Sequence, residues 1–231
     1  TLGAIQDKKL IFDLGKEIAR QCKLAGVHMN LAPVADCNFN PHNIVIHDRS
    51  FSDDPKLVSE CAYSMMFGMQ LGGVLTCAKH FPGHGDTVID SHLDLPVLNH
   101  DIKRLENIEL VPFKNLINNF VDAVMLAHLS VPALDDKNIT TFSKKIVHDF
   151  LEDKLNFSGL KITDGLGMGA VTKYFAPGEI EHKAFLAGFD ILLCPLDTEK
   201  AVNLIKNSIL SGDVTEAELD RRVLKILRAK E

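Results

Sequence analysis

Residues 74–92 read VLTCAKHFPGHGDTVIDSH and join a short apolar run to a polar loop that bears three histidines. The apolar run, Val74 to Lys79, is typical of a buried parallel strand, which needs little alternation because both of its faces are covered. Pro82 and the two nearby glycines then interrupt any regular element. The stretch therefore predicts a strand whose carboxyl end leads into a loop of chemically active side chains.

The same order of elements repeats along the chain on both sides of this strand. Segments with the 3.6-residue period of an amphipathic helix alternate with short apolar runs. The predicted helices cover residues 7–24, 55–71, 102–118, 144–155, 179–187, 199–210 and a last segment from Glu216, for which Thr215 and Glu218 form a capping box. The predicted strands cover residues 28–35, 74–79, 123–127, 160–163 and 190–193. This alternation predicts a parallel sheet covered by helices.

A closed barrel and an open doubly wound sheet both satisfy this order, so the position of the polar residues decides between them. They follow each predicted strand: Asp36, Lys79, His80, His128, Asp164 and Cys194. An open sheet concentrates such residues at one switch point, whereas the loops on one face of a barrel share one site. The sequence therefore predicts an α/β fold of the (β/α)8 TIM-barrel type, formed by a single catalytic domain over residues 1–231 without a linker.

Composition limits the possible partners. A chain of 231 residues with 46% hydrophobic residues can bury one sizeable core. Its net charge of −6, with dispersed lysines and arginines, offers no basic patch for nucleic acid or an anionic membrane, so we expect a small or neutral partner. The five cysteines form no CxxC pair, and no apolar stretch suggests a membrane span or signal segment. These features favour a cytoplasmic location.

The loop that bears His80, His84 and His92 allows three interpretations. In the first, the histidines only satisfy local hydrogen bonds. In the second, they bind a metal together with Asp86 or Asp90, although the Pro-Gly interruption removes the helical spacing of common metal motifs. The third is catalytic. Asp90 lies two residues before His92, where its carboxylate can orient the imidazole and favour the protonated form that a general acid requires.

A second unusual stretch, LKITDGLGMGA at residues 160–170, ends an apolar strand in a carboxylate and a glycine turn. Asp164 is placed like a nucleophile, and capping of the following helix is the structural alternative. The glycines and Ala170 also match a dinucleotide fingerprint. Two features oppose that reading, because Asp164 would place a negative charge beside the pyrophosphate and Asp190 opens its strand instead of closing it.

Together these residues resemble glycoside hydrolase family 3, particularly its branch of β-N-acetylglucosaminidases, the enzymes of peptidoglycan recycling. The resemblance covers nearly the whole chain and rests on stretches that occur in family order: NLAPVAD at 30–36, DRSF at 48–51, KHFPGHG at 79–85 with DSH at 90–92, MLAH at 125–128 and TDGLGM at 163–168. It implies a barrel-shaped glycoside hydrolase that acts as a β-N-acetylhexosaminidase.

The resemblance also implies catalytic roles. Asp164 would be the nucleophile of a retaining mechanism and form a covalent glycosyl intermediate. His92, paired with Asp90, would be the acid/base in place of the second carboxylate that most retaining glycosidases use. Imidazolium can protonate the leaving oxygen, and neutral imidazole can then activate water.

Further residues are implied to bind the sugar. In the family, residues matching Arg49, Lys79 and His80 bind N-acetylglucosamine, and those matching Asp36 and His128 lie near that pocket. A salt bridge of Arg49 with a neighbouring aspartate and a packing role for His128 are the structural alternatives. The resemblance implies a glycan substrate, an N-acetylglucosaminyl saccharide or a muropeptide, with no metal and no organic cofactor. The sequence indicates no oligomeric state.

The chain departs from the family pattern at its beginning. Family members carry a first barrel strand that ends in an Asp-rich Glu-Gly-Gly segment, and an aspartate of that segment holds the sugar. This chain lacks it, so we expect only five of the eight barrel strands here. The chain is then either a fragment or a barrel with an open side and an unpaired edge. Two rival functions stay open: a catalytically impaired glycan-binding remnant, and a β-glucosidase or phosphorylase of the same family.

Overall fold

The computed structural model describes residues 1–5 and 7–231, and in these residues the chain forms a parallel sheet with the strand order β1-β2-β3-β4. The strands are β1 (Met29–Asn30), β2 (Leu75–Phe81), β3 (Ala123–Leu126) and β4 (Leu160–Thr163). The α-helices are α1 (Lys8–Leu24), α2 (Pro55–Leu71), α3 (Ile102–Asn107), α4 (Leu110–Asn118), α5 (Gly169–Thr172), α6 (Glu179–Ala187), α7 (Thr198–Leu210) and α8 (Glu216–Lys230). A π-helix covers Lys145–Lys154, and short 3-10 helices cover Leu2–Ala4, His47–Arg49 and Thr140–Phe142.

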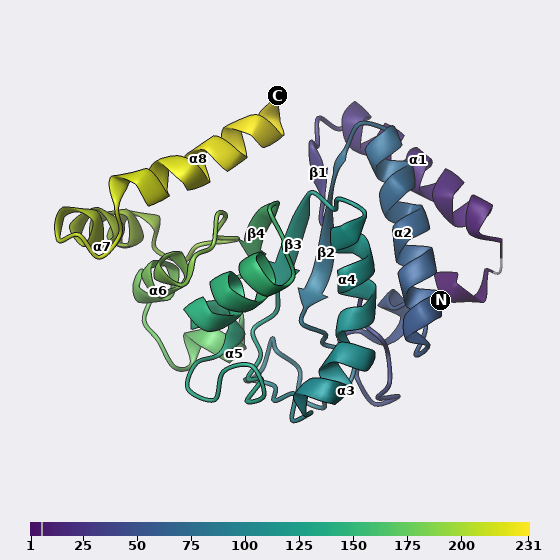
Figure 1. The fold of residues 1–231 in the computed structure, drawn as a ribbon, viewed down its shortest axis with the longest axis horizontal. Helices are drawn as coiled ribbons and strands as arrows, with labels where there is room; N and C mark the ends of the chain where they lie inside the picture. The colour runs from purple at the N-terminus through teal and green to yellow at the C-terminus, as the bar shows by residue number, and fades with distance from the viewer. Residues whose placement is uncertain (6) are drawn as a thin grey trace.

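Figure 1 shows the helices around the sheet, with α1 and α2 beside β1 and β2, and with α6, α7 and α8 beyond β4. Each strand runs parallel to its neighbour, and the register places Val124 of β3 opposite both Ala78 of β2 and Lys161 of β4. The loops after the strands therefore emerge at one edge of the sheet, as the predicted α/β fold requires. No helix in the described ranges is long and apolar enough to cross a membrane.

Two predicted strands are much shorter in the structure than the sequence indicated, and the predicted strand 123–127 is shorter by one residue. The run 28–35 forms only β1 and a separate bridge between Val34 and Lys79, because Pro33 within it has no N–H for the ladder. The run 190–193 forms one parallel bridge, from Ile191 to Ile162. Side chains replace part of its ladder: the Asp190 carboxylate accepts the Lys161 N–H at 2.8 Å, and Thr163 Oγ1 accepts the Leu193 N–H at 2.9 Å.

The predicted helices 55–71 and 179–187 have the observed bounds, but the predicted helix 102–118 is split into α3 and α4. The break falls at Ile108, whose φ of −131° is not helical. Pro112 explains it, because a proline ring clashes with the carbonyl four residues earlier in a continuous helix. Thr215 caps α8 by accepting the Glu218 N–H at 3.1 Å, whereas the Glu218 carboxylate turns to two arginines instead of completing a capping box.

The main core lies between the helices and the outer face of the sheet. Phe81 at the end of β2 packs edge-to-face against Phe113 of α4, with ring centroids 5.4 Å apart. Helices α1 and α2 approach closely at Gly68, where an added Cβ would lie 2.2 Å from the Phe12 carbonyl oxygen. A smaller apolar cluster covers the opposite face of the strands and contacts Ile226 of α8. The sheet is thus supported on both faces, and its carboxyl edge holds the polar loops.

Candidate active site

A pocket of about 130 Å³ lies at the carboxyl edge of the sheet. Five of the eight predicted site residues line it: Arg49, Lys79, His80, His92 and Asp164. Its other lining residues are Leu31, Val45, His84, Ser91, Met125, Met168 and Leu193. The remaining predicted residues, Asp36, Asp90 and His128, stand behind this wall and hydrogen-bond to residues in or next to it. The tertiary structure therefore gathers the sequence motifs around one cavity.

Asp36 anchors one side of the pocket. It is fully buried, with Oδ2 2.7 Å from Nδ1 of His80 and Oδ1 accepting the His84 backbone N–H at 2.7 Å. Burial by itself raises the pKa of this carboxyl, but the contact with His80 and the hydrogen bonds from His80 and His84 outweigh burial and hold the pKa below its ordinary value. Asp36 is therefore a charged support under His80 and not part of the pocket wall.

The neighbours of His80 determine its tautomer. Nε2 of His80 lies 3.3 Å from Nη2 of Arg49. A guanidinium can only donate, so Nε2 accepts, and Nδ1–H donates to Asp36. Arg49 also donates from Nη1 to the Val45 carbonyl at 3.0 Å, while the adjacent Asp48 contacts His47. The hydrogen-bonded chain Asp36–His80–Arg49 thus holds the side chains of His80 and Arg49 at the pocket. Arg49 contacts His80 and the Val45 carbonyl instead of forming the alternative salt bridge with Asp48.

Asp164 follows β4 directly and remains attached to the sheet, because its N–H donates to the Leu126 carbonyl of β3 at 3.0 Å. Its Oδ1 accepts the Gly165 N–H at 2.8 Å. Burial raises the pKa of this carboxyl, but His80, His128, the Gly165 N–H and Lys79 outweigh burial, so the pKa lies below its ordinary value. The next helix, α5, begins without a side-chain cap. Asp164 is thus an ionised carboxylate in the pocket wall and caps no helix.

Lys79 brings positive charge to the same wall. Burial and the nearby Arg49 lower the pKa of its amine, while the carboxylates of Asp164 and Asp36 act in the opposite direction. The site therefore combines a carboxylate with ammonium and guanidinium donors, a set that suits the hydroxyl and carbonyl oxygens of a polar ligand.

Asp90 and His92 form the predicted pair. Asp90 Oδ1 lies 2.8 Å from Nδ1 of His92 and accepts the His92 backbone N–H at 2.8 Å. Burial raises the pKa of Asp90, but these two hydrogen bonds outweigh burial and lower it. The His92 side chain is 62% exposed. With Nδ1 directed to Asp90, Nε2 is the atom that can exchange a proton with a bound ligand.

His128 supports the turn that carries Asp164. Its Nε2 lies 3.0 Å from the Gly165 carbonyl, so Nε2 carries the proton, and its Nδ1 accepts from the Thr141 hydroxyl at 2.6 Å. Burial lowers the pKa of this imidazole, although the negative charge of Asp164 acts to raise it. His128 is consequently a buried positioning group. Cys194, which the strand pattern placed at the same edge, is exposed and does not line the pocket.

His84 and Ser91 line the pocket, although sequence reasoning named neither as a site residue and considered His84 only for local hydrogen bonds or for a metal. Nδ1 of His84 lies 2.7 Å from Thr87 Oγ1, and Nε2 lies 3.0 Å from Ser91 Oγ. Thr87 donates its own proton to the His84 carbonyl at 3.0 Å, so His84 Nδ1–H is the donor and Ser91 Oγ–H the donor at the other nitrogen. Both ring nitrogens of His84 thus have hydrogen-bond partners. In the sequence, the signal that could have identified His84 as a pocket residue was the Gly-His-Gly tripeptide at residues 83–85.

His80 lies in β2 and not in the loop where the sequence placed it, whereas His84 and His92 do lie in the loop. The three histidines have separate partners, which argues against the metal interpretation. In the described part of the chain, one group with metal-ligand spacing near this loop comprises Asp86, His100 and Glu109. The Arg104 guanidinium lies 3.6 Å from Asp86 and 3.2 Å from Glu109 and already supplies the cation between them. The three histidines His80, His84 and His92 are not members of that group.

We expect the free energy of unfolding to fall as the pH is lowered from 7 to 5. Burial depresses the pKa values of His84 and His128, so both take up protons at a lower pH in the folded protein than in the unfolded chain, where protonation occurs near pH 6.5. Stability is therefore present above that pH and declines below it, by at most about 1.4 kcal/mol per pH unit for each histidine. Urea unfolding at both pH values measures the difference, and equal midpoints with equal slopes would contradict it.

Comparison with known proteins gives consistent matches. The pattern of the glycosyl hydrolase family 3 N-terminal domain matches residues 1–229. The β-hexosaminidase A of Pseudoalteromonas piscicida is 35% identical over 206 residues, which are 84% of this chain and 34% of that protein. A family 3 β-N-acetylglucosaminidase structure from Paenibacillus sp. superposes with a TM-score of 0.95 at 37% identity, covering 99% of this chain and 44% of the other.

A third match is the β-glucoside phosphorylase BglX, which superposes with a TM-score of 0.93 at 26% identity over 99% of this chain and 43% of that structure. The chain thus spans less than half the length of each of these three proteins.

Proposed function

This chain belongs to glycosyl hydrolase family 3, and we propose that it is the catalytic barrel domain of a retaining exo-β-N-acetylglucosaminidase. The observation that carries the proposal is the meeting of the ionised Asp164 and the Asp90–His92 pair at one pocket. The names of the Pseudoalteromonas and Paenibacillus relatives support the substrate class. We further propose terminal β-linked N-acetylglucosamine of muropeptides as the natural substrate.

In the first step, a carboxylate oxygen of Asp164 attacks the anomeric carbon of the sugar. The bond from that carbon to the aglycone oxygen breaks, and the departing oxygen takes a proton from the His92 imidazolium. The products are a glycosyl ester on Asp164, a neutral His92 and the free aglycone. Asp90 orients the imidazole for this transfer, because its carboxylate lies 2.8 Å from Nδ1.

In the second step, neutral His92 removes a proton from water as the water oxygen attacks the same carbon. The ester bond breaks, Asp164 leaves as a carboxylate, and His92 is again an imidazolium. Two inversions restore the β configuration. His92 acts first as the acid and then as the base, and no other side chain changes its protonation state. The histidine can therefore replace a second carboxylate.

The sugar would be held by the donors of the pocket wall. Arg49 is held in place through His80 by the hydrogen-bond chain to Asp36, and Lys79 stands beside His80 on β2. Donors that are already oriented lose little entropy when the ligand binds. A pocket, in contrast to a long groove, favours removal of a terminal sugar over cleavage within a chain.

Hydrolysis of nitrophenyl β-N-acetylglucosaminide tests the proposal, with the protein assayed both as residues 1–231 and in the longest form that its gene encodes. We expect release of nitrophenol and N-acetylglucosamine. A folded protein that turns over neither this glycoside nor a β-glucoside in either form would favour the glycan-binding remnant.

Phosphorolysis is the second candidate, favoured by the structural match to a β-glucoside phosphorylase and by the chemistry of the acid/base. Neutral His92 carries no negative charge to repel an incoming phosphate, whereas a carboxylate in its place would. The same assay with and without inorganic phosphate separates the two reactions. Formation of a sugar 1-phosphate would identify a phosphorylase, and free sugar as the product in phosphate would exclude one.

A further inference from the structure

The loop that bears His92 is docked on the segment that follows the Asp164 turn. The Ala170 N–H donates to the Ser91 carbonyl at 3.1 Å, and the Gly169 N–H donates to the His92 carbonyl at 3.2 Å. Two successive N–H groups at the start of α5 thereby hold two successive carbonyls of the loop. The backbone on both sides of the His92 side chain is tied to an element that begins five residues after Asp164.

Gly169 makes this contact sterically possible. A Cβ at this position would lie 2.5 Å from the His92 carbonyl oxygen and 2.8 Å from that of Leu93. Both neighbours are backbone atoms, which cannot rotate away as a flexible side chain can. Gly169 does not have a positive φ, so its own conformation is open to alanine. The glycine is therefore required by the loop that rests on it and not by its own turn.

A side-chain clamp extends the contact. Asp94 Oδ1 accepts from the Tyr174 hydroxyl at 2.7 Å, and Asp94 Oδ2 accepts from Lys173 Nζ at 3.0 Å. These two hydrogen bonds, with a third from its neighbour Leu95, lower the pKa of Asp94 to about 2. An exposed ion pair alone contributes little to stability. The clamp therefore adds to the backbone contact at Gly169 but does not replace it.

We propose that residues 169–174 are the docking platform of the acid/base loop, with Gly169 and Asp94 as positioning residues for His92. The proposal rests on the proposed function, because it assigns to this contact the alignment of acid/base and nucleophile. Residues 169–174 and Asp164 belong to one continuous segment after β4. A loop that docks on residues 169–174 is therefore held in a fixed position relative to Asp164. The Ser91–His84 hydrogen bond holds the same loop on its other side.

The test replaces Gly169 with alanine, with Gly167→Ala as the matched control in the same turn. The control Cβ would meet only the Leu196 side chain at 3.5 Å, an ordinary contact, and Gly167 also lacks a positive φ. The purified protein is assayed for kcat/KM with phenyl and dinitrophenyl β-N-acetylglucosaminides. The phenyl group needs protonation to leave, whereas the dinitrophenyl group does not, so the comparison isolates the acid.

We expect Gly169→Ala to lower kcat/KM about 10- to 100-fold for the phenyl glycoside, the effect of a catalytic group displaced by about 1 Å. The loss with the dinitrophenyl glycoside should stay below about threefold, and Gly167→Ala should match the wild type on both substrates. Asp94→Ala should show the same pattern with a smaller loss. Equal losses of Gly169→Ala on both substrates, or none on either, would overturn the proposal.

Amide hydrogen exchange separates failure of this proposal from failure of the proposed function. Exchange in residues 90–94 should be faster in Gly169→Ala than in Gly167→Ala, whatever reaction the protein catalyses. A wild type inactive on both glycosides would refute the proposed function, while faster exchange would still establish the docking. Unchanged exchange in residues 90–94 of a folded Gly169→Ala protein would show that the platform does not hold the loop.

Discussion

Replacing Asp164 with asparagine should lower hydrolysis of nitrophenyl β-N-acetylglucosaminide by at least about 10,000-fold, the scale on which loss of a nucleophile is measured in other enzymes. The amide keeps the size of the side chain and can still accept the Gly165 N–H at Oδ1. It has no anionic oxygen to form the glycosyl ester. The expected loss is therefore one of chemistry and not of folding.

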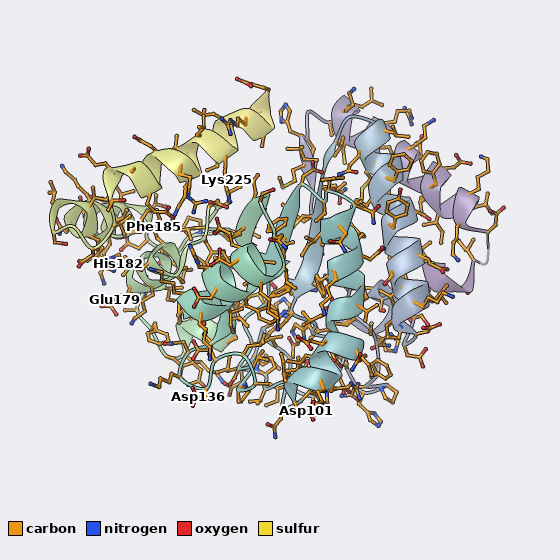
Figure 2. The ribbon with its side chains drawn as sticks, in the orientation of Figure 1. Asp101, Asp136, Glu179, His182, Phe185 and Lys225 are labelled. Atoms are coloured by element: carbon orange, nitrogen blue, oxygen red, sulfur yellow. The ribbon has the colours of Figure 1, made fainter. Side chains whose placement is uncertain are left out.

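The matched control is Asp136→Asn, which removes the carboxylate of an exposed residue, labelled in Figure 2, that does not line the pocket. It should retain wild-type kcat/KM, and thermal unfolding should show that both variants are folded. Mass spectrometry of acid-quenched wild type should detect a covalent sugar that Asp164→Asn lacks. If Asp164→Asn keeps activity within about tenfold of the wild type, the nucleophile is another group.

Replacing His92 with alanine should lower kcat/KM for the phenyl glycoside by about 100- to 10,000-fold, the range that general acid catalysis supplies. The dinitrophenyl glycoside should lose far less in kcat/KM, because its leaving group needs no proton. Its turnover should then be limited by the second step, in which His92 is the base. Added azide should restore that turnover and yield a β-glycosyl azide, because an anionic nucleophile needs no base.

His42→Ala serves as the control for this variant, because His42 is an exposed histidine that does not line the pocket. It should behave as the wild type with both substrates and show no response to azide. Equal losses with the two leaving groups in His92→Ala, without azide rescue, would assign His92 to sugar binding and leave the acid/base unidentified.

Local patterns in the sequence were sufficient for most elements and for the contact between Asp90 and His92. The bounds of α2 and β4 were predicted as observed, since Asp54 and Pro55 begin the helix and a glycine turn ends the strand. Asp90 and His92 are two residues apart, so their hydrogen bond could be inferred without a fold. The break at Ile108 was missed although Pro112 indicated it. Apolar residues recur with helical spacing on both sides of Ile108, so the sequence predicted one continuous helix.

The remainder of the site depends on long-range contacts. Asp36 and His80 are 44 residues apart in sequence. The buried hydrogen bond between them exists only because β1 pairs with β2, which brings the segment after β1 next to the end of β2. The same holds for the Gly169 contact with the loop of His92. Sequence by itself determined the residue types, the local elements and the family of this protein, because these are properties of short stretches. Only the tertiary structure decided which side chains face the pocket and which support it, because burial and hydrogen-bond partners are set by packing between distant segments.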